Sequence, residues 1–170
     1  MKATLSIILI STSLAFRQSV PDKIPSVTVK SLNGSSFNTQ NIANNGKPIL
    51  LCFWATWCRS SVKELDAIAE LYPDWQKETG VKLVAISYDD ARSVGKVNTM
   101  VKVKNWTYDV YLDINQDFKR AMNVNICPHT FLIDNKGGIV WQSSSYLQGS
   151  EDNIYELVKK LARNEEIERN

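Results

Sequence analysis

The amino-acid sequence predicts an α/β fold, a single domain with a central mixed β-sheet flanked by helices. The run Ile49–Trp54 is apolar without interruption, which is typical of a strand buried on both faces. Apolar residues then recur at helical spacing from Val62 to Trp75, and a second apolar run follows at residues 81–87. A strand, a helix and another strand in this order favour a sheet that helices cover. At 170 residues the chain has room for one proper core.

Residues ahead of the central strand predict an N-terminal β-hairpin extension. Residues 27–29 and 35–37 flank Asn33-Gly34, and an Asn-Gly pair between extended runs is a strong signal for a hairpin turn. Residues 38–45 are expected to form a short helical turn, after which residues 46–48 lead into the central strand.

The rest of the chain alternates helices with strands. Thr79-Gly80 supplies a stop for the long helix, and Asp89-Asp90 can cap a helix through Val101. The remaining expected elements are a strand at 110–112, a short helix at 116–122, a hairpin of 130–133 with 139–142, and a closing helix with an apolar stripe from Ile154 to Leu161.

The first 15 residues have the pattern of a cleavable secretory signal. Lys2 supplies a positive charge, residues 3–14 are uncharged, and Ser13-Leu14-Ala15 offers small residues for a signal peptidase. The alternative is a retained membrane anchor, but the apolar run is shorter than the roughly 20 residues that span a bilayer. We therefore expect a signal peptide at 1–15, a lead-in segment at 16–25, a domain at 26–163 and a tail at 164–170. The mature protein would be exported, periplasmic or otherwise extracytoplasmic, without stable membrane insertion, where thiols can be oxidised.

Composition argues against several classes of partner. The net charge is only +2, and charges of both signs are mixed along the chain, so no nucleic-acid partner is expected. One histidine and three scattered cysteines do not form a convincing metal cluster. We therefore expect neither a metal nor another cofactor.

Cys58 is the candidate nucleophile. It lies where the central strand gives way to the first turn of the long helix. Unpaired backbone N–H groups and the positive end of the helix dipole favour a negative charge there. A thiol in this position is driven toward thiolate, which is the nucleophilic form. Cys52, inside the buried strand, is expected to be an inert core thiol.

Two motifs give the chain a resemblance to a known family. Residues 53–58, Phe-Trp-Ala-Thr-Trp-Cys, are similar to the active-site entry of thioredoxin-fold proteins, especially the exported TlpA/ResA-like thiol–disulfide oxidoreductases. Residues 127–134, Cys-Pro-His-Thr-Phe-Leu-Ile-Asp, resemble the cis-proline loop of that family and the strand after it. The resemblance covers residues 24–161. It implies a thioredoxin-like fold and thiol–disulfide exchange with protein substrates and a redox partner protein.

The family's W-C-x-P-C-x-x-E motif is altered in this chain. Trp57, Cys58 and Glu64 match it, whereas Ser60 and Ser61 replace the proline and the second cysteine, which leaves a CxxS motif. A two-cysteine oxidoreductase uses its second thiol to expel the reduced substrate. The Ser61 hydroxyl cannot form a disulfide, although it could donate a hydrogen bond to the Cys58 thiolate.

Cys127 is the candidate for a relocated resolving thiol. In thioredoxin folds the residue before the cis-proline lies against the first active-site cysteine. The resemblance therefore implies that Cys58 and Cys127 are neighbours that could bond, if their Cα atoms lie about 4.4–6.8 Å apart. The alternative is that Cys127 is a small apolar residue filling a loop position.

Two charged residues could tune the Cys58 thiol. Glu64 matches the glutamate that the family uses as a nearby proton acceptor or pKa modulator, and its alternative is an ordinary exposed helix charge. A carboxylate near Cys58 would raise the thiol pKa. Arg59, next to Cys58, could favour the thiolate.

Three further residues are candidate substrate contacts. Trp57 could offer a flat apolar surface beside the reactive sulfur. Pro128, if cis, would leave the preceding backbone free to pair with an extended substrate strand. His129 could approach the site as a base or a substrate contact, and its alternative is an ordinary loop histidine.

The leading hypothesis is an exported thioredoxin-like oxidoreductase that acts on protein cysteines, with a monothiol variant included. A redox-inactive binding module that keeps the fold and the cis-proline groove is the alternative, and an ordinary pKa of Cys58 would favour it. A thiol peroxidase fits less well. Proteins that resemble peroxidases of this fold carry a threonine three residues before the reactive cysteine. This chain has Ala55 at that position.

Overall fold

Within residues 20–168, seven strands form one mixed sheet in the order β2-β1-β5-β4-β3-β6-β7. The structure, a computed structural model, describes residues 20–168. The expected signal peptide at 1–15 therefore lies outside the described residues. The strands are β1 Thr28–Ser31, β2 Ser36–Asn38, β3 Ile49–Trp54, β4 Lys82–Ser87, β5 Asp109–Leu112, β6 His129–Ile133 and β7 Ile139–Ser143.

Strand β3 is an interior strand of the sheet, as the apolar run predicted. It pairs in parallel with β4 and antiparallel with β6, and every residue from Ile49 to Trp54 is buried. The parallel pairing of β3 with β4 confirms the βαβ unit. The antiparallel pairing of β6 with β7 confirms the final hairpin. The α/β class with a central mixed sheet is therefore correct.

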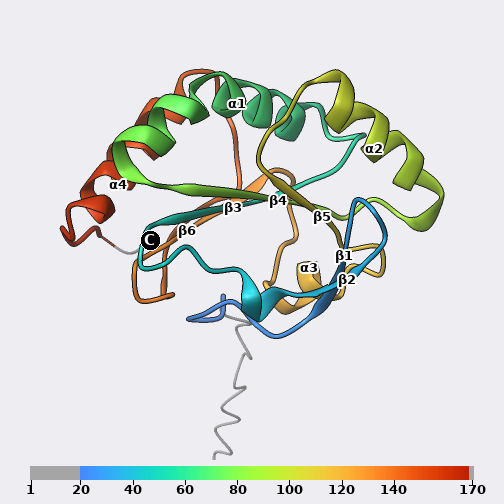
Figure 1. The fold of residues 1–170 in the computed structure, drawn as a ribbon, viewed down its shortest axis with the longest axis horizontal. Helices are drawn as coiled ribbons and strands as arrows, with labels where there is room; N and C mark the ends of the chain where they lie inside the picture. The colour runs from blue at the N-terminus through green and yellow to red at the C-terminus, as the bar shows by residue number, and fades with distance from the viewer. Residues whose placement is uncertain (1–19, 169–170) are drawn as a thin grey trace, which may run out of the picture.

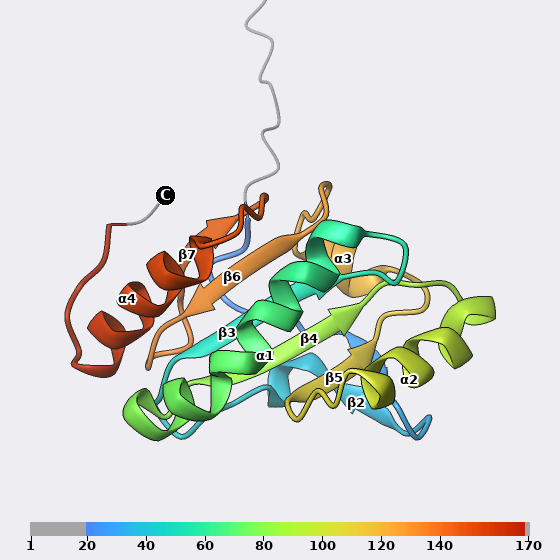
Figure 2. The same cartoon turned by 90° about the horizontal axis from the view of Figure 1, so that it is seen from above.

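In the described part of the chain, four α-helices cover the two faces of the sheet unequally (Figures 1 and 2). They are α1 Arg59–Thr79, α2 Val94–Val103, α3 Asp117–Ala121 and α4 Ser150–Ala162, with 3-10 turns η1 Thr39–Asn41 and η2 Ala91–Ser93. Helices α1, α2 and α4 pack on one face, around a cluster that includes Leu65, Val97 and Val158. The short helix α3 lies on the other face, where Phe118 packs against Phe53.

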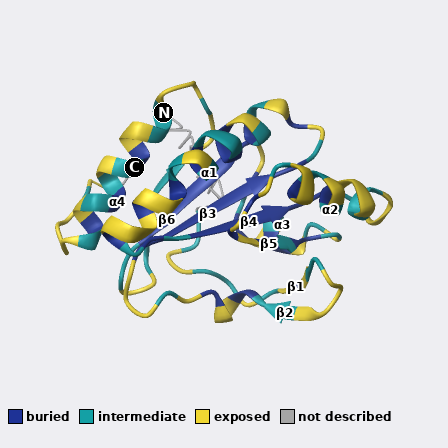
Figure 3. Cartoon of the chain, turned by 45° about the horizontal axis from the view of Figure 1, so that its top comes forward, coloured by how far each residue is buried: buried dark blue, intermediate teal, exposed yellow. Residues whose placement is uncertain are grey.

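Helix α1 begins and ends where the sequence indicated. Cys58 is its N-cap, and Gly80 follows its last residue with φ of 69°, a left-handed conformation that glycine adopts without steric cost. Its apolar stripe lies against the sheet, so that the helix is buried on its inner side and exposed outside (Figure 3). Among residues 20–168, no helix is both long enough and apolar enough to span a bilayer.

The N-terminal hairpin is an integral part of the sheet. Strands β1 and β2 pair antiparallel as expected, and β1 also pairs antiparallel with β5. The rings of Phe37 and Tyr111 stack with centroids 4.3 Å apart across this junction. The hairpin therefore extends the main sheet by two strands.

The segment before β1 crosses the face that carries α3. The Asp22 carbonyl accepts a hydrogen bond from the Ile139 amide at 2.8 Å, and Lys23 forms an isolated bridge with Gly138 at the start of β7. Val20 and Ile24 pack against the buried cluster of this face. Residues 20–27 therefore run from one edge strand, β7, toward the strand β1 near the other edge.

Candidate functional site

The turn between β3 and α1 is held by a buried carboxylate. The Cys58 amide donates to the Ala55 carbonyl at 3.0 Å. Thr56 donates to Asp89 twice, from its amide at 2.9 Å and its hydroxyl at 2.7 Å, and Ser87 adds a third hydrogen bond at 2.9 Å. Asp89 is itself buried. Asp89 thereby fixes the backbone that presents Cys58 at the start of α1.

Cys58 and Cys127 are joined by a disulfide. Their Cα atoms lie 6.5 Å apart, although 69 residues separate them in the sequence. Cys127 lies in the loop before β6, and the peptide bond between Cys127 and Pro128 is cis. The resemblance implied that these two residues are neighbours, and they are bonded in the structure. The alternative, that Cys127 only fills a loop position, does not hold.

The two serines of the motif make different contacts. The Ser61 hydroxyl is fully buried and donates to the Cys58 carbonyl at 2.8 Å, so it does not face the sulfur. In this disulfide-bonded state Ser61 makes no hydrogen bond with the Cys58 sulfur, because its position in the first turn directs it toward the backbone. Ser60 instead places its hydroxyl 3.4 Å from the Cys58 sulfur.

Glu64 is a buried carboxyl group, not an exposed helix charge. Only 2% of the residue is exposed, and the Thr130 hydroxyl donates to its Oε1 at 3.1 Å. Its Oε2 has no hydrogen-bond partner. Burial raises the pKa of Glu64 to about 7, because the ionised form loses its hydration. The helical spacing of α1 turns this side chain inward, toward β3 and β6.

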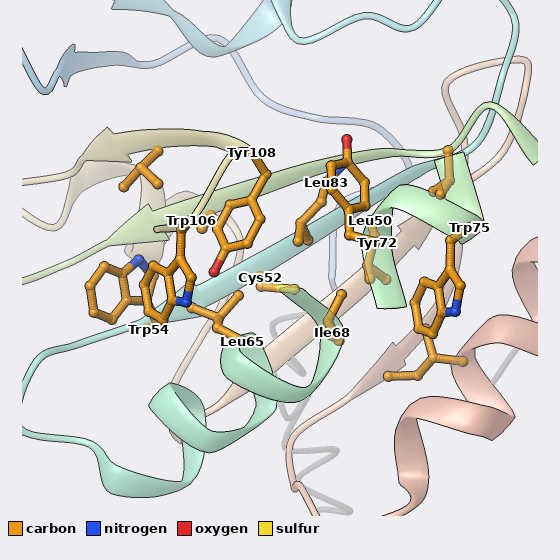
Figure 4. Close-up of a cluster of buried hydrophobic side chains, with 14 of the residues drawn as sticks. Leu50, Cys52, Trp54, Leu65, Ile68, Tyr72, Trp75, Leu83, Trp106 and Tyr108 are labelled. Atoms are coloured by element: carbon orange, nitrogen blue, oxygen red, sulfur yellow. The ribbon is translucent and has the colours of Figure 1, made fainter. Parts of the chain in front are cut away.

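Cys52 is the free thiol of the core, as expected. It is fully buried among apolar side chains of β3, α1 and the β4–β5 side of the sheet (Figure 4). Burial, reinforced by the nearby Glu64 carboxyl, raises the pKa of Cys52 well above its ordinary value. Such a thiol stays protonated and unreactive.

His129 is the first residue of β6 and not a loop residue. It is buried, its ring stacks on Phe131 with centroids 4.5 Å apart, and its Nε2 lies 3.0 Å from Oε1 of Gln142. Its Nδ1 has no hydrogen-bond partner. Burial lowers the pKa of His129, which favours the neutral ring.

An exposed apolar residue precedes each of the two bonded cysteines in the sequence. Trp57 precedes Cys58 and is 63% exposed, and Ile126 precedes Cys127 and is 59% exposed. The Trp57 ring meets the buried Tyr88 edge-on, with centroids 5.7 Å apart. Trp54, by contrast, is a core residue. Each cysteine of the disulfide is therefore preceded in the sequence by an accessible apolar side chain.

A groove runs alongside the start of α1. Arg59, Ser60 and Lys63 line one side of it, and Tyr146 and Leu147 from the β7–α4 connection line the other. Arg59 is exposed next to Cys58. Within residues 20–168, no group of three or more histidine, cysteine or acidic side chains could hold a metal ion.

Comparison with known proteins places the chain in a family. The model of the AhpC/TSA family matches residues 20–142. The chain belongs to the AhpC/TSA family. Among similar proteins is the thiol-disulfide oxidoreductase ResA of Bacillus thuringiensis (strain Al Hakam), which is 30% identical over 132 residues, 74% of this chain and 70% of that protein. The thioredoxin-like protein YneN of Bacillus subtilis is 31% identical over 119 residues, 68% of this chain and 65% of that protein. Both agree with the TlpA/ResA-like motifs.

Solved structures confirm the thioredoxin-like fold of this AhpC/TSA family member. A thioredoxin-like protein from Porphyromonas gingivalis superposes with a TM-score of 0.75 and 38% identity, covering 88% of this chain and 97% of that chain. The DsbE-type thiol:disulfide interchange protein of Chlorobium tepidum gives a TM-score of 0.72 at 19% identity, over 85% and 98% of the two chains. The second comparison supports the fold alone.

Sequence reasoning missed two residues of the site. The pair Asp89-Asp90 was expected to supply a helix cap, and Asp90 does so by accepting from the Arg92 amide, but the inward-facing role of Asp89 was not foreseen. Ser60 was noted only as a replacement for proline. A hydroxyl two residues after a helix-capping cysteine was the available signal for its contact with the sulfur.

Proposed function

We propose that this protein is a thiol–disulfide oxidoreductase in which Cys58 is the nucleophile and Cys127 the resolving thiol. The disulfide between these two residues is the observation that carries the proposal. Ser61 cannot resolve a mixed disulfide, so the second thiol comes from the loop before β6. The name of the relative ResA supports the same reaction class.

The proposed exchange has two successive steps. In the reduced protein the Cys58 thiolate attacks a substrate disulfide, and the other substrate sulfur leaves as a thiolate that takes a proton from solvent. The Cys127 thiolate then attacks the Cys58 sulfur, forming the Cys58–Cys127 bond and releasing the second substrate thiol. The substrate gains two electrons and the protein loses two. A dithiol redox partner protein restores the reduced form by the same exchange in reverse.

The residues around the disulfide fit roles in this exchange. Trp57 and Arg59 are exposed at the start of α1 and are proposed to contact substrate proteins. The backbone before the cis Pro128 would pair with an extended substrate strand, and His129 would help to shape that surface. Glu64 would act as a proton acceptor, since a pKa of about 7 lets it gain and lose a proton near neutral pH.

The proposed location is extracytoplasmic, after cleavage of the signal peptide. An oxidising compartment would allow the Cys58–Cys127 disulfide to persist between catalytic cycles. The alternative is a binding module without redox activity, which would leave the thiols unreactive toward substrate.

The test combines a non-reducing peptide map with insulin reduction. We expect a Cys58–Cys127 peptide linkage that dithiothreitol removes, and insulin reduction that is abolished in Cys58→Ser. Cys127→Ser should accumulate a mixed disulfide on Cys58, because nothing resolves it. Cys52→Ala is the matched control and should retain activity, since Cys52 is buried in the core. Free Cys58 and Cys127 after mild oxidation, or full activity in Cys127→Ser, would refute the two-cysteine mechanism.

A further inference from the structure

The Cys58 sulfur has a hydroxyl contact that the family motif does not predict. The Ser60 Oγ lies 3.4 Å from the Cys58 Sγ, within hydrogen-bonding distance for sulfur. A disulfide sulfur carries no hydrogen, so the Ser60 hydroxyl must be the donor in the bonded state. Ser60 is the second residue of α1 and is partly buried, which limits competition from water.

Two other kinds of donor at the start of α1 do not bond the Cys58 sulfur. The Cys58 side chain makes no capping hydrogen bond with the backbone N–H groups of the helix. The Ser61 hydroxyl donates to the Cys58 carbonyl at 2.8 Å. Among the described residues, Ser60 therefore makes the one side-chain hydrogen bond found at this sulfur.

We propose that Ser60 is a catalytic residue that stabilises the Cys58 thiolate, an inference that rests on the proposed function. When the disulfide is reduced, the negative charge on Cys58 converts a weak contact into a charge-assisted hydrogen bond. Ser60 keeps its proton throughout and makes no covalent bond. It stabilises Cys58 both as an attacking thiolate and as the thiolate that leaves when the disulfide is opened.

The expected effect has a distinctive dependence on pH. Losing one hydrogen bond to the thiolate should raise the pKa of Cys58 by about 1. At a pH below the pKa of Cys58 in both the variant and the unaltered protein, the variant has about tenfold less thiolate. A more basic thiolate is intrinsically more nucleophilic, so the net rate falls only about threefold. Well above both pKa values, the variant should react about threefold faster. The two pH profiles must therefore cross.

The experiment measures alkylation of Cys58 by iodoacetamide from pH 5 to 10. Reduced full-length mature protein is used, and the Cys58 peptide is quantified by mass spectrometry, so that Cys52 and Cys127 do not contribute. The variants are Ser60→Ala, Ser60→Thr, which retains the hydroxyl, and Ser61→Ala, which removes the neighbouring one. The titratable or charged groups on the surrounding elements are Arg59, Lys63 and Glu64 on α1, Tyr88 and Asp89 after β4, Cys127 in the loop before β6, His129 at the start of β6, and Tyr146 and Glu151 across the groove. They are the same in all variants, so their influence cancels in the comparison.

We expect a raised pKa and a crossed profile for Ser60→Ala, with Ser60→Thr close to the unaltered protein and Ser61→Ala without the crossing. A Ser60→Ala profile that superposes on the unaltered one would overturn the role of Ser60 while leaving a low-pKa Cys58 and the proposed function intact. An ordinary Cys58 pKa in the unaltered protein would overturn both. A crossing seen only in Ser61→Ala would assign the hydroxyl to Ser61 and reject Ser60.

Discussion

The buried carboxyl group of Glu64 should make the protein less stable as the pH rises through neutrality. Burial raises its pKa from 4.5 to about 7 in the folded state. The unfolded chain ionises near the lower value, so the folded state binds more protons between the two. Stability is therefore fully present below pH 4.5 and is lost as the pH rises toward 7 and just beyond. The total loss is about 3 kcal/mol.

Glu64→Gln removes the ionisation and keeps the shape of the side chain. The amide oxygen can still accept the hydrogen bond that Thr130 donates to Oε1. We compare the free energy of unfolding of the variant with that of the unaltered protein at each pH. Between pH 4.5 and pH 8 this difference should shift by about 3 kcal/mol in favour of the variant. His129 and Asp113, whose pKa values are also shifted by burial, contribute equally to both proteins.

The assay is urea unfolding of the oxidised protein at four pH values from 4.5 to 8. Glu70→Gln is the matched control, because Glu70 lies on the exposed side of the same helix. Its curve should follow that of the unaltered protein. A stability difference between Glu64→Gln and the unaltered protein that does not change with pH would refute the assignment of a raised pKa to Glu64.

Two further predictions concern stability. Asp89→Ala should lower the free energy of unfolding by about 3 kcal/mol in urea unfolding, because it leaves the Thr56 amide and two hydroxyls without their acceptor. Asp89→Asn should lose less stability. A loss below about 0.5 kcal/mol in Asp89→Ala would contradict the anchoring role of Asp89. The oxidised protein should be up to about 4 kcal/mol more stable than the dithiothreitol-reduced protein, because the disulfide spans 69 residues. Cys58→Ser should show no such dependence on reductant, and equal stability of both redox forms would contradict this prediction.

Most of the fold could be predicted because its signals are local. The apolar run of β3, the stop at Gly80 and the Asn33-Gly34 turn each depend on a few neighbouring residues. The pairing of β1 with β5 joins segments that are far apart in the sequence, and neither strand carries a local signal for its partner. The sheet was therefore predicted in its parts but without the junction of its N-terminal hairpin.

The site was predictable to the level of residues but not of atoms. Cys58 precedes a helix and Cys127 precedes a proline, and these positions identified both cysteines as candidate site residues. Whether Ser60 or Ser61 faces the sulfur depends on about 100° of rotation per residue around the helix axis. Helical phase and the packing of α1 decide that question, and they also decide that Glu64 points into the core.

The segment at residues 20–27 has a consequence for the order of folding. Its contacts with Ile139 and Gly138 join the start of the described chain to its last strand, so they close a very long loop. Such contacts form slowly and late, after the more local pairings are in place. Until then, the apolar cluster beneath the sheet stays open on that side, where Val20 and Ile24 will later lie. The folding chain would thus pass through a period in which this face is vulnerable to aggregation, and that period ends only when residues 20–27 dock.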